Sequence, residues 1–116
     1  MISLINTLTG MKIDIHRQTF AVANKTGGVS GPAIRPIAVR MVYEAANAVK
    51  VPIIGMGGIT CAEDALEFIL AGASAVSVGT ASFYNPMAAV QVAEGIEAYM
   101  RQHRAEHIRD LVGIVK

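Results

Sequence analysis

Two glycine-rich segments most constrain the fold, because each comes at the end of a short apolar run typical of a buried strand. Gly55-Met56-Gly57-Gly58-Ile59 closes the run 52–56, and Gly79-Thr80 follows the run 75–78. A segment with the apolar period of a helix comes after each of them. Repeated strand–helix units predict an α/β fold with a parallel sheet and right-handed crossovers.

The chemistry of these glycines indicates an anion site. A backbone that approaches an anion closely leaves no room for a side chain, which favours glycine. The amides of Gly57 and Gly58 would face a phosphate beside the positive end of the next helix. Gly79 and Thr80 would add an amide and a hydroxyl from the neighbouring strand. The alternative is that the glycines only permit tight turns.

The spacing of the two sites decides between an open doubly wound sheet and part of a (β/α)₈ barrel. Barrels of this type often bind phosphate with the loops after strands 7 and 8. We therefore predict the C-terminal part of a (β/α)₈ TIM barrel, about strands 6–8. A dinucleotide-binding fingerprint is excluded, because Thr60 stands where its third glycine belongs.

The remaining elements follow from apolar periodicity and helix boundary signals. The runs 2–8, 52–56 and 75–78 predict strands, and the alternation within 12–23 predicts a β-hairpin inserted before the first helix. Helices are expected over 32–49, 60–72, 85–104 and 106–112. The second would open with a capping box of Thr60 and Glu63 and end at Gly72. The third would bury the stripe Val90, Ala93, Ile96 and Met100.

Composition narrows the class of protein. Hydrophobic residues make up 53% of the 116 residues and charged residues 16%, which predicts a buried core in a single domain. The net charge of +1 without a basic stripe argues against nucleic acid as a partner. No apolar run approaches the roughly 20 residues that span a bilayer. A single cysteine, Cys61, and no secretory signal indicate a cytoplasmic protein.

The first third of the chain carries more specific motifs. They are Ile5-Asn6-Thr7-Leu8-Thr9-Gly10-Met11, Ile13-Asp14, and the run from Asn24 to Pro36 that includes Gly27-Gly28-Val29-Ser30-Gly31. With Pro52 to Ile59 and Glu63 to Val76, these segments resemble the dihydroorotate dehydrogenase family over essentially the whole chain. The nearest subgroup is the class 1B type, which passes electrons to NAD through a partner subunit.

The resemblance implies roles for residues at matching positions. Asn6 and Thr7 would contact the pyrimidine substrate, since an amide matches a ring edge with alternating C=O and N–H groups. Ile5 would pack near the flavin, and the backbone of Gly31 would approach it. The FMN phosphate would be held by Gly57, Gly58, Gly79 and Thr80.

The implied activity is oxidation of dihydroorotate to orotate in de novo pyrimidine biosynthesis, with hydride passing to FMN. The implied partner is an electron-transfer subunit that carries FAD and an iron–sulfur cluster. The family's catalytic cysteine and a flavin-contacting lysine precede the stretch found here, so no catalytic residue is assigned. Cys61 is interpreted as structural, and Lys25 as a solvated side chain.

The length limits what the isolated chain can do. A full barrel needs about 250 residues, so we expect 1–116 to form a partial, FMN-binding barrel domain that is inactive alone and self-associates through open sheet edges. The alternatives are a non-catalytic FMN- or phosphate-binding partial barrel, or another FMN barrel such as dihydropyrimidine dehydrogenase or dihydrouridine synthase. No metal site is expected, because His103 and His107 lack a third ligand.

Overall fold

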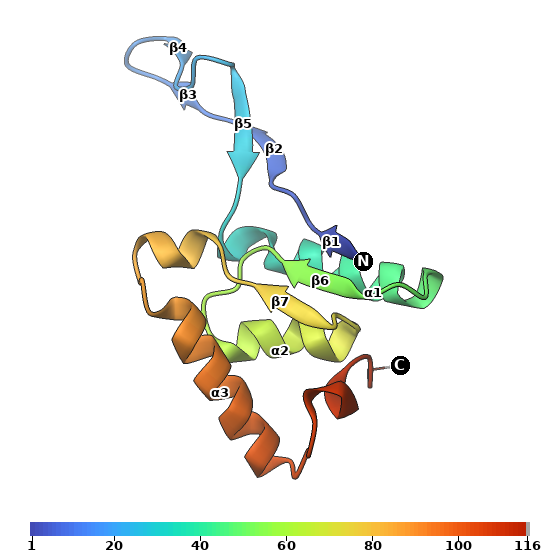
Figure 1. Cartoon of the computed structure of the whole chain (residues 1–116). Coiled ribbons are helices and arrows are strands. Elements are labelled where there is room, and N and C mark those ends of the chain that lie inside the picture. Colours follow the sequence, from blue (N-terminus) through green and yellow to red (C-terminus); the bar gives the residue numbers. More distant parts are fainter. Residues whose placement is uncertain (116) are drawn as a thin grey trace.

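The computed structural model describes residues 1–115, which are built around a three-stranded parallel sheet (Figure 1). The strand order is β1 (Ile2–Leu4), β6 (Ile53–Met56) and β7 (Ala75–Ser77). Ile2 pairs with Ile53 at one side, and Ile54 pairs with Ala75 at the other. Within the described residues β1 and β7 each pair with β6 alone, so both outer edges of the sheet are open.

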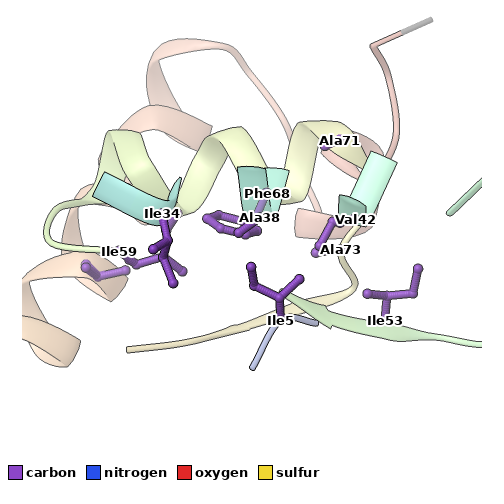
Figure 2. Close-up of a cluster of buried hydrophobic side chains, with 11 residues drawn as sticks. Ile5, Ile34, Ala38, Val42, Ile53, Ile59, Phe68, Ala71 and Ala73 are labelled. Atoms are coloured by element: carbon purple, nitrogen blue, oxygen red, sulfur yellow. The ribbon is translucent and has the colours of Figure 1, made fainter. Parts of the chain in front are cut away.

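Two helices cover one face of this sheet, α1 (Arg35–Ala48) and α2 (Ala62–Ala71). Phe68 of α2 is fully buried, lies beside Ala38 of α1 and belongs to the same core cluster as Ile53 of β6 (Figure 2). Gly55 allows this contact, because a Cβ there would come within 2.7 Å of the Phe68 ring. Burial of one large apolar side chain contributes roughly 1.5–3 kcal/mol.

The opposite face of the sheet is more open. It carries the alternate residues Ser3, Ile54, Met56, Ala75 and Ser77, which are half-buried or exposed. Because side chains alternate between the two faces of a strand, this is the face that a closed barrel turns towards its interior.

An arm of two short antiparallel ladders extends away from the sheet between β1 and α1 (Figure 1). Its stem is β2 (Leu8–Met11) paired with β5 (Thr26–Val29). Its tip is β3 (Ile13–Asp14) paired with β4 (Thr19–Phe20), inside the range expected for the hairpin. At the turn, the Asp14 carboxylate accepts hydrogen bonds of 3.0 Å from the backbone amides of His16 and Arg17.

Three 3₁₀ helices and α3 complete the chain. The 3₁₀ helices are Pro32–Ile34, Thr80–Phe83 and Ile108–Leu111, and α3 spans Ala88–Gln102. Among residues 1–115, no helix has both the length and the apolar character needed to cross a membrane.

Several expected boundaries are wrong, including that of the last expected helix, 106–112, where the structure has a 3₁₀ helix over Ile108–Leu111. The first strand does not continue to residue 8, because the chain leaves the sheet after Leu4 and re-forms as β2 of the arm. Helix α1 begins at Arg35 rather than Pro32, since 32–34 wind as a 3₁₀ turn.

The expected capping box is also wrong. Cys61, not Thr60, is the N-cap of α2, and its side chain makes no capping bond. The carboxylate that faces back belongs to Asp64, which accepts bonds from the Thr60 amide at 2.8 Å and hydroxyl at 2.6 Å. The end of α2 is confirmed, since Gly72 caps it with φ of 122°.

The buried stripe of α3 differs from the prediction as well. Ala88 and Val92 are buried, whereas Val90 and Ala93 are exposed and Ile96 and Met100 are half-buried. Gly95 explains the choice, because a Cβ there would overlap the Ala62 side chain of α2. The small residues Gly95 and Ala62 let α3 approach α2 closely, so the side of α3 that carries Gly95 is the packed side.

Candidate functional site

A cavity of about 140 Å³ lies where the three parallel strands end. The residues predicted to bind ligand, apart from Asn6, all line it: Ile5, Thr7, Gly31, Gly57, Gly58, Gly79 and Thr80. It is also lined by residues that were not predicted: Ser30, Ile34, Met56, Ile59, Thr60, Ser77 and Ala81. The carboxyl ends of strands are where α/β folds place ligands.

The turn after β6 requires glycine twice. Gly57 and Gly58 have φ of 122° and 81°, a region that residues with side chains rarely adopt. A Cβ on Gly58 would also come within 2.7 Å of the Gly31 carbonyl oxygen and 2.9 Å of Arg35 Cβ. The two glycine segments of the cavity, 31 and 57–58, are therefore packed directly against each other.

The donors of the cavity suit an anion. Among the residues that the structure describes, the amides of Gly57, Gly58 and Thr80 donate to no other protein group. The amide of Thr80 opens a 3₁₀ helix whose N-cap is Gly79. Of the described residues, those that line the cavity carry no charged side chain. Backbone amides and hydroxyls together form the type of cradle that binds phosphate at turns and helix starts.

A hydrogen bond joins two walls of the cavity. The Thr80 hydroxyl donates to the Ser30 hydroxyl at 2.8 Å, which connects the loop after β7 to the loop before α1. Ser30 was missed from the sequence, because a serine in a glycine-rich loop is also typical of an ordinary turn.

Asn6 and Thr7 are adjacent to the cavity at the base of the arm. The Asn6 side-chain oxygen accepts a bond of 2.8 Å from the Thr7 amide, and both residues are exposed. The opposite strand approaches Thr7 so closely that a Cβ on Gly28 would come within 2.7 Å of Thr7 Cβ. Gly28 therefore fixes how Thr7 sits at the edge of the cavity.

A buried carboxylate lies behind the glycine turn. Asp64 is 5% exposed and forms an ion pair with Arg35 at the start of α1. Burial alone would raise the pKa of this carboxyl, but bonds from Thr60 and the charge of Arg35 outweigh it and lower the pKa. Asp64 thus stays ionised at neutral pH.

Cys61, Lys25 and the histidines lie outside the cavity lining. Partial burial and the carboxylates of Glu63 and Asp64 raise the pKa of the Cys61 thiol, which disfavours a reactive thiolate. Lys25 is exposed, with its ammonium 5.7 Å from the centre of the Phe20 ring.

His103 stacks on Tyr99 with ring centres 3.9 Å apart. Within the described part of the chain, histidine, cysteine and carboxylate side chains form no cluster suited to a metal ion.

Comparison with known proteins identifies the family. A family model described as dihydroorotate dehydrogenase matches residues 1–100. The chain belongs to the dihydroorotate dehydrogenase family.

Bacterial members of this family are similar to the chain along nearly its whole length. A protein of Lachnoclostridium phytofermentans named dihydroorotate dehydrogenase B (NAD(+)), catalytic subunit, is 70% identical over 115 residues. Proteins of the same name from Alkaliphilus oremlandii and Pelobacter propionicus are 62% and 57% identical. The match covers 99% of this chain but 38% of the Lachnoclostridium protein, so the chain spans well under half of that relative.

The crystal structure of an Eimeria tenella dihydroorotate dehydrogenase in complex with ferulenol has the same fold. It superposes with a TM-score of 0.78 at 27% identity, over 97% of this chain and 30% of that one. Together with the parallel sheet, this likeness confirms the predicted partial (β/α)₈ barrel.

Proposed function

We propose that this chain is the flavin-phosphate-binding part of an FMN-dependent dihydroorotate dehydrogenase, which oxidises dihydroorotate to orotate in pyrimidine biosynthesis. One observation carries the proposal. The residues predicted to contact substrate and FMN, apart from Asn6, are spread from 5 to 80 in the sequence and line a single cavity at the ends of the strands. The family and the names of the bacterial relatives favour dihydroorotate over the substrates of other FMN barrels.

The cavity fits the phosphate end of FMN. Among the described residues, the amides of Gly57, Gly58 and Thr80 donate to no other protein group, and the positive φ of Gly57 and Gly58 shapes the turn at the cavity. In the proposal these residues and Gly79 hold the phosphate, while Ile5 and Gly31 contact the flavin. The flavin supplies the two-electron acceptor for the oxidation.

The substrate would lie beside Asn6 and Thr7. The Asn6 oxygen accepts hydrogen bonds from the Thr7 amide at 2.8 Å and from the Thr7 hydroxyl at 3.5 Å, which leaves the Asn6 NH₂ group and the acceptor side of the hydroxyl to face a pyrimidine ring. An amide and a hydroxyl offer the donors and acceptors that match its alternating C=O and N–H edge.

The whole enzyme is proposed to be cytoplasmic and to pass electrons to a second subunit with FAD and an iron–sulfur cluster. The words "catalytic subunit" in the names of the relatives support such a partner. The base that removes a proton from dihydroorotate is proposed to lie outside this chain. We therefore propose that the isolated chain binds flavin and substrate analogue without turnover.

The test uses orotate and the flavin-loaded chain. Addition of orotate should shift the visible flavin band, and Asn6→Ala should abolish the shift. Asn47→Ala, on the exposed part of α1, is the matched control and should keep it. Dihydroorotate should not bleach the flavin under anaerobic conditions. Bleaching would contradict a base outside the chain, and an orotate shift that survives Asn6→Ala would contradict the substrate site.

A further inference from the structure

The ion pair of Arg35 and Asp64 joins the first turns of two helices. Arg35 Nη1 contacts Asp64 Oδ1, and Arg35 Nε lies 3.6 Å from Glu67 Oε1. The other Asp64 oxygen accepts both the amide and the hydroxyl of Thr60. The carboxylate therefore connects α1, α2 and the last residue of the glycine turn 57–60.

The same pair is in direct contact with the cavity wall. Thr60 lines the cavity, and Gly58 packs against Arg35, since a Cβ on Gly58 would lie 3.1 Å from the Arg35 amide nitrogen. Gly31, the other glycine in contact with Gly58, precedes Arg35 by a single 3₁₀ turn. The glycine turn is thus held at one end by Asp64 and along its side by Arg35.

The Arg35–Asp64 pair is more buried than the ion pairs on the helix surfaces. The Asp64 and Arg35 side chains are 7% and 27% exposed, whereas Arg40 and Glu44 on the same helix are each 59% exposed. Exposed pairs contribute little to stability. Removal of one partner from a buried pair leaves the other charge uncompensated, so loss of this pair should disturb the groups bonded to it more than loss of an exposed pair would.

We propose that Arg35 and Asp64 are positioning residues that hold the turn 57–60 in the shape that binds the FMN phosphate. This inference rests on the FMN function proposed above. Neither side chain needs to touch the phosphate, because Asp64 acts through the amide and hydroxyl of Thr60 and Arg35 packs against Gly58. The specific consequence is a preference for FMN over riboflavin, which differs from FMN by the phosphate alone.

The test compares three variants of the full chain. Asp64→Asn keeps the size of the side chain and removes its charge. Arg35→Lys keeps the positive charge but loses the planar fork of the guanidinium, and it is the milder variant if Asp64→Asn does not fold. Glu44→Gln breaks the exposed pair on the same helix and is the matched control.

Two readouts are needed. The first is the backbone order parameter of the Gly57, Gly58 and Thr60 amides by NMR relaxation without flavin. We expect about 0.85 in the original chain and below about 0.6 in Asp64→Asn. The second is the ratio of the Kd values for riboflavin and FMN, which should fall roughly tenfold in Asp64→Asn, less in Arg35→Lys, and not at all in Glu44→Gln.

The outcomes separate this inference from the proposed function. Unchanged order parameters in both Asp64→Asn and Arg35→Lys overturn the inference. Lowered order parameters without any change in the ratio of the Kd values for riboflavin and FMN also overturn it. Equal binding of riboflavin and FMN by the original chain contradicts the proposed function instead. In that case the order parameters alone decide whether the pair positions the turn.

Discussion

The hydroxyl of Thr80 donates a hydrogen bond of 2.8 Å to the hydroxyl of Ser30, fifty residues earlier in the chain. Both residues line the cavity, so the bond holds the loop after β7 against the loop before α1. This contact brings together the two parts of the chain that were assigned separately to the phosphate and to the flavin.

Replacement of Ser30 should therefore affect the ligand more than the fold. Ser30→Ala removes a bond that is exposed to solvent, so the free energy of unfolding should change by less than about 0.5 kcal/mol. FMN affinity should fall about fivefold, since one net hydrogen bond contributes about 1 kcal/mol. Fluorescence titration with FMN measures this, and Ser82→Ala, outside the cavity lining, is the control. Equal affinities for the two variants would contradict a role for Ser30.

The glycines of the two loops should respond differently to alanine. A Cβ on Gly79 would meet no other atom within 4 Å, and its φ is −107°, so Gly79→Ala should fold normally. It adds a methyl group to the cavity wall and should weaken FMN binding about tenfold or more. Gly58→Ala should instead destabilise the fold by about 1–3 kcal/mol, because φ is positive and the site is crowded.

Urea unfolding and FMN titration of both variants check this contrast. Gly27→Ala is the control for stability, since Gly27 has open space around it and lies in the arm. Gly79→Ala that binds FMN as tightly as the original chain would argue against a phosphate at this loop.

The Asp64 carboxylate should make stability depend on pH. Its pKa in the folded state lies below the value of about 3.9 expected in the unfolded state, so the folded state binds this proton less readily. The stability that the ionised carboxylate contributes is fully present above about pH 5 and is lost as the pH falls through the folded-state pKa. Asp64→Asn should thus be clearly less stable than the original chain at pH 7, and the difference should narrow towards pH 3. A difference in unfolding free energy that stays constant over this range would contradict the account.

The open edges of the sheet should cause self-association. Strands β1 and β7 each have one unpaired edge within residues 1–115. The free backbone N–H and C=O groups of such an edge readily pair with a strand of another chain. Two copies related by an axis parallel to the strands would pair β7 with β1 of the partner in the parallel sense on both sides. We expect a dimer or larger species in light scattering. A monodisperse monomer at micromolar concentration would contradict this expectation.

The sequence predicted those parts of the fold that depend on local backbone requirements. Gly72 ends α2 because it adopts a φ of 122°, and Gly57 and Gly58 mark the turn at the cavity for the same reason. These requirements are properties of single positions, so they can be read without knowledge of the tertiary contacts. The order of strands and helices follows from apolar runs in the same way.

The predictions that were wrong concern features that depend on contacts between distant segments of the chain. The face of α3 is decided by the close approach of Gly95 to Ala62, and Val90 is equally apolar but has no such neighbour. Glu63 and Asp64 are both acidic residues at the start of α2, and Asp64 is the one that bonds Thr60 and pairs with Arg35 of the distant helix α1. The resemblance indicated seven of the residues that line the cavity. Ser30 was not among them, because its role arises from its contact with Thr80.

The most direct test of the central claim is the visible absorption spectrum of the purified chain after FMN is added and the excess is removed by gel filtration. We expect a retained flavin band in the protein fraction, and a much weaker band when riboflavin replaces FMN. A colourless protein fraction would contradict the claim that this cavity holds the phosphate of FMN without the remainder of the barrel.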